Sequence, residues 1–272
     1  MTDQNEKHVS PATPEPPSGE IAALRAEVVA LTEIVTEMSK RDRQVQSVLT
    51  AVNKQTRAIP AQVQAIHQLL ARFPPRAVLP TVGGWAVDPT TLLWMVEHVV
   101  RQQAELVVEC GSGTSTVWLA LAVRETGGRV IALEHSEEYR DATQAQLEAH
   151  DVADVVDLRH APLVPTATER GEFSWYDVDT TGLEGIDMLL VDGPPGNTGP
   201  LARYPAIPTF AGLLADGATV VVDDVSRKDE RVMVDHWLAE QPQLRREEQL
   251  GFNTEVLVAD SGRLRPSKPD LP

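Results

Sequence analysis

The chain has 272 residues with 24 Lys and Arg against 40 Asp and Glu, and its formal net charge of −16 argues against a nucleic-acid-binding protein, because such a surface field repels phosphate. The 42% of hydrophobic residues suffices for one sizeable core, yet no apolar run approaches the roughly 18 residues that cross a bilayer. The start of the chain lacks the basic and apolar segments of a signal peptide, and the single Cys110 excludes an intrachain disulfide, so we expect a cytoplasmic protein.

The first 80 residues predict three segments. Residues 1–19 contain four prolines among polar residues, a composition that favours a disordered tail. Residues 20–59 contain neither glycine nor proline and predict a long helix. Residues 60–80 contain four more prolines, which predict a broken helix followed by a linker.

Apolar residues of the 20–59 helix recur at alternating steps of three and four. The series is Ile21, Leu24, Val28, Leu31, Val35, Met38, Val45, Leu49 and Val52, interrupted at Asp42. A heptad series of this length predicts a coiled coil that makes the protein a homo-oligomer, and the β-branched residues at most a positions favour a parallel dimer. The alternative is an amphipathic helix that packs on its own domain.

From about residue 81 to 260, apolar runs alternate with helical segments. Helices are predicted at about 89–102, 114–125, 137–149, 205–215 and 229–240; strands are predicted at 105–109, 129–133, 154–158, 186–191 and 218–222, with 244–250 and 254–259 as an antiparallel hairpin. Nearly continuous apolar strands are typical of a parallel sheet covered on both faces. The pattern predicts a doubly wound, Rossmann-like α/β fold with a mostly parallel seven-stranded sheet, followed by a flexible tail at 261–272.

A glycine-containing turn joins the first predicted strand to the next helix, with the sequence Glu109-Cys110-Gly111-Ser112-Gly113-Thr114-Ser115. Glycines in such a turn let the backbone approach a ligand, and the helix N-terminus offers unpaired N–H groups. The third glycine of the dinucleotide fingerprint is missing because position 116 is Thr, and no Lys follows as in a phosphate-binding loop. Nucleotide phosphates are therefore not the favoured ligand.

Glu134 ends the second predicted strand. A carboxylate at this place can accept hydrogen bonds from both hydroxyls of a ribose, as the acidic residue of a dinucleotide site does. The alternative is a solvated acid at the end of a strand.

Three aspartates end two further strands. Asp192 follows the fourth strand, and Asp223 and Asp224 follow the fifth, so adjacent parallel strands would bring all three to one crevice. Clustered carboxylates repel one another unless a cation lies between them, and a hard divalent ion such as Mg²⁺ prefers oxygen ligands. In the alternative, Asp223 caps the following turn and Asp224 pairs with Arg227 or Lys228.

The glycine turn, Glu134 and the run 187–192 resemble class I S-adenosylmethionine-dependent methyltransferases. Within these the chain is most similar to a bacterial group marked by Val-Asp-Gly-Pro-Pro-Gly, Arg-Tyr-Pro-Ala and Val-Asp-Asp, which stand here at 191–196, 203–206 and 222–224. The resemblance covers roughly 81–260 and identifies that segment as a methyltransferase domain. It specifies the superfamily and leaves the substrate open.

The resemblance implies a role for each residue of the predicted site. The methionine part of S-adenosylmethionine would contact Glu109, Gly111, Ser112, Gly113, Thr114 and Ser115. Glu134 would bind the ribose, and His135 and Ala161 would flank the adenine. Asp192 would lie where the methyl group is transferred. Catechol-type and sugar-modifying O-methyltransferases place acidic metal ligands at these strand ends, so Asp192, Asp223 and Asp224 are the expected catalytic and metal-binding residues.

Four residues are expected to contact the acceptor or, alternatively, to pack in the core. They are Arg203, Tyr204 and, on a loop before the fourth strand, Trp175 and Tyr176. The expected activity is methyl transfer to a hydroxyl oxygen of a small molecule, sugar or glycolipid, with possible assistance from Mg²⁺. The alternative is a coiled-coil scaffold whose domain binds the cofactor without turnover, because no Lys or His base stands beside Asp192. A dinucleotide oxidoreductase is disfavoured by the Thr at position 116.

Overall fold

The computed structural model describes residues 18–79, 87–251 and 253–260. The tail predicted at 261–272 and nearly all of the one predicted at 1–19 lie outside these residues. The chain divides into two compact units, Met1–Arg57 and Ala58–Pro272. Within the described ranges, no helix is both long and apolar enough to cross a membrane.

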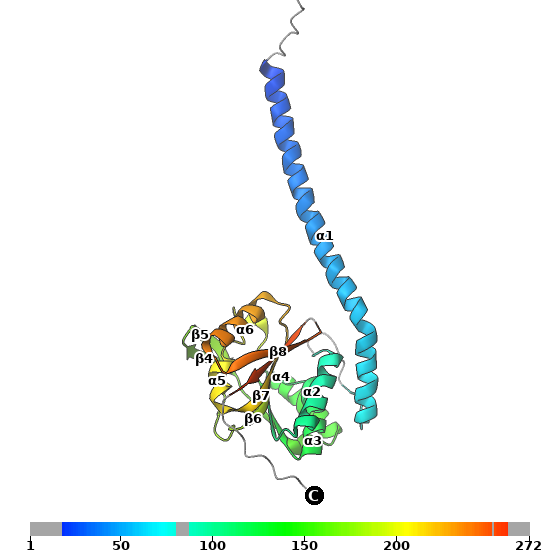
Figure 1. The fold of residues 1–272 in the computed structure, drawn as a ribbon, viewed down its shortest axis with the longest axis vertical. Coiled ribbons are helices and arrows are strands. Elements are labelled where there is room, and N and C mark those ends of the chain that lie inside the picture. The colour runs from blue at the N-terminus through cyan, green and yellow to red at the C-terminus, as the bar shows by residue number, and fades with distance from the viewer. Residues whose placement is uncertain (1–17, 80–86, 252, 261–272) are drawn as a thin grey trace, which may run out of the picture. The chain divides into compact units, whose positions relative to one another are not determined.

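A single helix, α1 (Ser18–Arg72), contains the segment predicted as a coiled coil (Figure 1). It continues through Pro60, where the prediction had a broken helix, and ends at Arg72. Pro60 removes one backbone hydrogen bond from the helix. Leu69 and the following Phe73 are buried in a core cluster of the second unit. Tertiary packing of this last part therefore keeps the chain helical beyond the proline, and the linker begins only after Arg72.

The second unit is built around a seven-stranded sheet of order β3-β2-β1-β6-β7-β9-β8. The strands are β1 (Leu106–Cys110), β2 (Arg129–Glu134), β3 (Val156–His160), β6 (Ile186–Val191), β7 (Leu214–Val222), β8 (Leu244–Leu250) and β9 (Thr254–Ala259). The first five in spatial order are parallel, whereas β9 runs antiparallel to both β7 and β8. The predicted mostly parallel sheet with an antiparallel C-terminal hairpin is thus confirmed.

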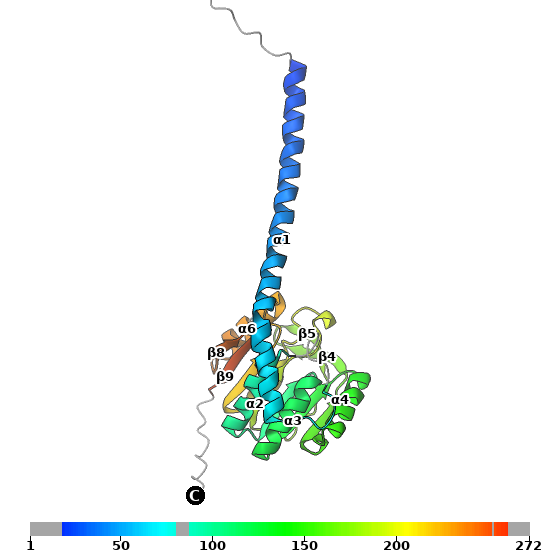
Figure 2. The same cartoon turned by 90° about the vertical axis from the view of Figure 1, so that its right-hand side faces the viewer.

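Helices cover both faces of this sheet (Figures 1 and 2). They are α2 (Pro89–Gln102), α3 (Thr114–Thr126), α4 (Glu137–Ala149), α5 (Ala206–Phe210) and α6 (Lys228–Glu240), with short 3₁₀ turns at 153–155, 196–198 and 211–213. On β1, Val107 belongs to the core cluster with α2 and α3, and its neighbour Val108 belongs to the cluster with α5 and α6. Burial on both faces explains why these strands are continuous apolar runs.

A small hairpin of β4 (Leu163–Thr168) and β5 (Gly171–Tyr176) forms a separate two-stranded sheet. The sequence predicted a loop here, but Trp175 and Tyr176 lie at the end of β5 and are buried. The turn between the two strands consists of Glu169 and Arg170, which lack the usual Asn-Gly or Asp-Gly signal of a hairpin. The aromatic residues of β5 gain stability by packing on the main core rather than from the hairpin itself.

Candidate active site

The glycine turn between β1 and α3 approaches the loop that follows β6. Gly111 has φ +93°, and a Cβ there would lie 3.3 Å from the backbone nitrogen of Gly193. A Cβ on Gly193 would lie 2.2 Å from the hydroxyl of Tyr176. Both positions therefore require glycine, because the ends of β1 and β6 are brought into contact here.

The last two residues of β1, which precede these glycines, have buried side chains. Cys110 is fully buried at the end of β1, and burial raises the pKa of its thiol. The Glu109 carboxylate accepts hydrogen bonds from the hydroxyls of Ser115 and Thr116, the latter at 2.6 Å. Burial raises the pKa of Glu109 to about 7, although these two hydrogen bonds favour the ionised form. Thr116 replaces the third glycine of a dinucleotide turn and supports the carboxylate instead.

Glu134, at the end of β2, has 4% of its surface exposed and links the turn to the next helix. One of its carboxylate oxygens accepts hydrogen bonds from the N–H of Ser112 at 3.1 Å and from its hydroxyl at 3.3 Å. The other accepts from the N–H of Ser136 at 2.9 Å, and Nδ1 of His135 lies 2.9 Å from it. The carboxylate is therefore held in one orientation by backbone N–H and hydroxyl donors.

A cavity of about 500 Å³ opens above these strand ends. Its lining residues are Gly111, Ser112, Glu134, His135, Tyr139, Tyr176, Gly193, Pro195, Asn197 and Thr198. The volume suits a nucleoside-sized ligand. Five residues predicted from the sequence meet in this cavity, while Tyr139 and the loop 193–198 were missed as lining residues. The exposed Tyr139 on the otherwise polar first turn of α4 was the available signal.

Other residues predicted for the cofactor lie beside the cavity rather than along it. Gly113, Thr114 and Ser115 are at the start of α3, and the Gly113 N–H donates to the Thr116 hydroxyl at 2.9 Å. Ala161 is buried in the core directly after β3. These residues therefore support the cavity from the start of α3 and the end of β3.

The four residues predicted to contact the methyl acceptor lie in different surroundings in the structure. Tyr176 lines the cavity, and its buried hydroxyl has no hydrogen-bond partner among the described residues. Trp175 is packed in the core, as is Tyr204, whose hydroxyl donates to Glu240 at 2.7 Å. Arg203 extends into the aspartate cluster. Only Tyr176 thus faces the cavity directly.

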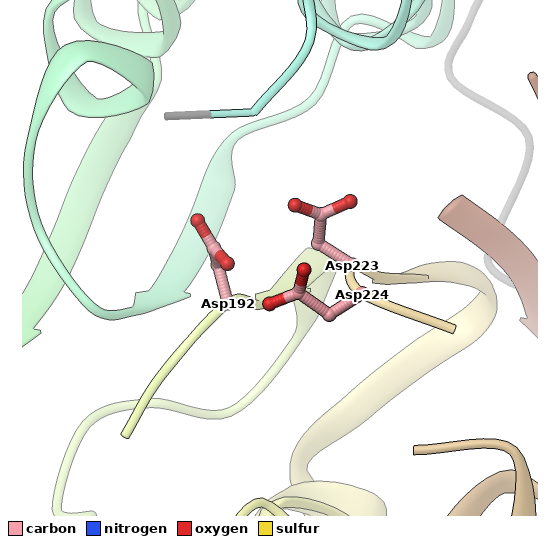
Figure 3. A group of neighbouring side chains, drawn as sticks. All are labelled: Asp192, Asp223 and Asp224. Carbon is pink, nitrogen blue, oxygen red and sulfur yellow. The ribbon is translucent and has the colours of Figure 1, made fainter. Parts of the chain in front are cut away.

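The three aspartates meet at the neighbouring ends of β6 and β7, as the sequence predicted (Figure 3). One carboxylate oxygen from each of Asp192, Asp223 and Asp224 lies within 4.8 Å of the others. Burial raises the pKa values of Asp192 and Asp223. The Thr254 hydroxyl donates to Asp223 at 2.7 Å. The crevice thus brings acceptor oxygens together where the side chains are largely buried.

Arg203, which is only 3% exposed, is the cation of this cluster. Its guanidinium donates to the Asp224 carboxylate at 2.9 Å and to the Asp223 carbonyl oxygen at 3.1 Å, and lies 3.5 Å from Asp192. Arg227 also contacts Asp224, at 2.8 Å, as one alternative interpretation of the sequence had it. Two guanidinium groups therefore offset part of the negative charge of three carboxylates.

The same cluster also has the donor set of a site for a hard cation. Two ligands on one Mg²⁺ at about 2.1 Å can lie no more than about 4.2 Å apart, so the oxygens need only small side-chain rotations to converge. Asp192 and Asp223 have oxygens that Arg203 does not bind at hydrogen-bond distance. The residues present therefore fit an oxygen-ligated divalent ion.

Comparisons with known proteins agree with this arrangement. A family model described as "Methyltransferase domain" matches residues 108–225, which run from β1 to the aspartates after β7. None of the curated proteins compared with the sequence matches it.

Two similar solved structures share the fold. Cofactor-bound Rv0187 from MTB has 21% sequence identity and a TM-score of 0.50, over 74% of this chain and 89% of that one. The SAH-bound methyltransferase PaMTH1 of Podospora anserina has 16% identity and a TM-score of 0.51, over 74% of this chain and 88% of that one. The chain thus resembles methyltransferase domains over residues 108–225 and shares a Rossmann-like fold with these two structures.

Proposed function

We propose that the protein transfers a methyl group from S-adenosylmethionine to a hydroxyl oxygen of a small molecule, sugar or glycolipid. The observation that carries this proposal is the cavity bounded by Gly111, Ser112 and Glu134 on one side and by Gly193, directly after Asp192, on the other. A ligand held at the ends of β1 and β2 would extend to the end of β6. This is the crevice in which open α/β sheets bind their ligands.

The residues around the cavity would divide the cofactor between them. Glu134 would accept hydrogen bonds from the ribose hydroxyls, and His135 and Tyr139 would contact the adenine. The free N–H groups at the start of α3 would face the carboxylate of the methionine part. Its ammonium group, placed near Glu109, would hold that carboxyl ionised although burial raises its pKa to about 7.

The aspartate cluster would bind the acceptor. A bound divalent ion would supply a Lewis acid that lowers the pKa of the acceptor hydroxyl. Arg203 would hold Asp192 and Asp224 in place, and Tyr176 would close the cavity against water. In-line transfer needs the acceptor oxygen aligned with the sulfonium methyl group, so these residues act mainly by orientation.

Self-association is the second part of the proposal. The heptad seam of α1 supports a coiled coil between copies of this chain, because its apolar side chains are exposed within the first unit.

Calorimetric titration tests the cofactor site. S-adenosylhomocysteine is expected to bind, and NAD is not. Glu134→Ala should weaken S-adenosylhomocysteine binding at least tenfold, because charge-assisted hydrogen bonds to the ribose are lost. Glu138→Ala, an exposed acid on the first turn of α4, is the matched control and should bind as the wild type does.

Transfer of a labelled methyl group tests turnover. Incorporation of label from S-adenosylmethionine into small molecules of a cell extract would support an enzyme. Cofactor binding without incorporation would instead support the alternative of a non-catalytic scaffold.

A further inference from the structure

The first unit exposes an apolar seam along α1. Leu24, Val28, Leu31, Val35 and Met38 each expose 59–61% of their surface, and Val45, Leu49 and Val52 expose 49–55%. Contiguous exposed apolar surface of this kind marks an interaction site. The seam follows heptad positions, which fits a second helix with the same repeat.

The charges along the same helix are divided by sign. Residues 18–37 contain four Glu and one Arg, a net charge of −3, whereas residues 38–57 contain five Lys or Arg and one Asp, a net charge of +4. The helix macrodipole favours such a division only within the first and last turns. Glu27, Glu33, Glu37, Lys40 and Arg41 lie far from both ends of the helix, so the macrodipole does not explain them.

This division favours one orientation of a helix pair. A parallel pair places the acidic halves side by side and the basic halves side by side. An antiparallel pair places each acidic half beside the basic half of the other copy, which lowers the electrostatic energy.

Asp42, the one charged residue of the seam, favours the same orientation. In a parallel pair in register, each residue of the seam faces the same residue of the second copy. The two Asp42 carboxylates would then meet inside the seam. Like charges at that distance repel strongly. In an antiparallel pair an a position faces a d position, and Asp42 would face Leu31 of the second copy. The two Asp42 residues would then lie about 16 Å apart along the axis, beyond the Debye length of roughly 10 Å.

The seam also matches itself when reversed. Antiparallel pairing sets Ile21 against Val52, Leu24 against Leu49, Val28 against Val45, Leu31 against Asp42 and Val35 against Met38. Every position from Ile21 to Val52 thus has a partner, and only Leu31 faces a polar one. We propose that α1 of a second copy of this chain covers the seam in antiparallel orientation, with Leu24 facing Leu49 of the second copy. This proposal rests on the self-association proposed above and adds its orientation and register, in place of the parallel pairing that the β-branched a positions favour.

Cysteine cross-linking of the full-length protein tests the orientation. Light scattering should first report a dimer. Leu24→Cys alone and Leu49→Cys alone should form no intermolecular disulfide on mild oxidation, because each residue lies far from its own copy. The double variant should form two disulfides per dimer, one at each end of the seam, and tryptic peptides 8–25 and 44–54 should be found joined to each other. The native Cys110 is buried, so wild type provides the background, and Ala26→Cys, away from the seam, is the matched control.

The possible results separate the orientation from the association. A dimer in which Leu24→Cys alone links to its own copy is parallel and overturns the orientation while self-association stands. A monomer in light scattering overturns both. Neither result affects the proposed methyl transfer, which the titration and labelling experiments address.

Discussion

The acids at the carboxyl ends of the sheet form two groups that are stabilised in different ways. At the ends of β1 and β2, Glu109 and Glu134 accept hydrogen bonds mainly from hydroxyl and backbone N–H groups. At the ends of β6 and β7, the aspartates are held by the buried guanidinium of Arg203. Neutral donors leave the first group able to accept a ligand that carries hydroxyls or a positive charge. The second group already contains a fixed cation, so a ligand has to supply less positive charge to compensate its carboxylates.

Removing that fixed cation should have the largest effect. Arg203→Met leaves buried carboxylates without their partner and should lower the free energy of unfolding by about 3–5 kcal/mol in urea denaturation. The matched control is Arg227→Met, because this arginine contacts the same Asp224 but is 45% exposed. Its cost should stay within about 1 kcal/mol. Equal losses for the two variants would contradict the distinction between a buried and a peripheral partner.

The burial of Glu109 among neutral donors predicts a dependence of stability on pH, because burial raises the pKa of its carboxyl more than the two hydrogen bonds lower it. Its pKa is about 7 in the folded protein and 4.5 as the ordinary value, so between these pH values the folded state keeps a proton that the unfolded chain releases. The contribution of Glu109 to stability therefore falls as pH rises from 4.5 to 7 and is constant above.

Glu109→Gln should remove this fall. The variant should match the wild type near pH 4 and exceed its unfolding free energy at pH 8 by on the order of 3 kcal/mol, as measured by urea denaturation at both pH values. A wild-type advantage at pH 8 would mean that the ionised carboxylate is stabilised more than burial destabilises it.

Chelation should affect only the second group of acids. EDTA should reduce methyl transfer at least 100-fold, equivalent to about 2.7 kcal/mol, because the acceptor loses its Lewis acid. Cofactor affinity in calorimetry should change less than twofold, and Asp223→Asn should behave in the same way. Transfer at the full rate after chelation would show that the metal role is wrong and that these aspartates cap the strand ends or contact the substrate.

The smallest of these effects is expected where the two groups meet. Gly193→Ala should cost about 1–3 kcal/mol of stability, because its methyl group would collide with the Tyr176 hydroxyl. In a Tyr176→Phe background the same substitution should cost measurably less, and a double-mutant cycle gives the difference. Additive costs would place the strain at the backbone of Cys110 and Gly111 instead.

The sequence predicted the centre of the sheet well because β1, β2, β6 and the second half of β7 are short apolar runs, and burial on both faces requires that composition. Asp192, Asp223 and Glu134 could be placed because they end such runs, and adjacent parallel strands bring their ends together. Pro60 misled the prediction, since the local cost of a proline was smaller than the gain from packing Leu69 and Phe73, which the sequence does not reveal.

The contact of Arg203 with the aspartates was harder to predict from the sequence. Its guanidinium reaches them from a segment after the loop 193–202, and the spacing of residues along the chain does not show where that loop leads. Tyr204 beside it turns instead into the core. The hairpin β4–β5 was missed for a related reason, because its strands are stabilised by contacts with distant residues rather than by a recognisable turn.

The buried thiol of Cys110 gives the protein an internal reporter of sheet opening. It is the sole cysteine and lies at the centre of the parallel sheet, where reagents cannot reach it. Because only the thiolate reacts and burial disfavours it, modification must proceed through molecules whose sheet has opened. The labelling rate of the unmodified chain thus measures how often that centre opens, and a ligand bound across the adjoining glycines should slow it by the factor by which binding favours the closed sheet.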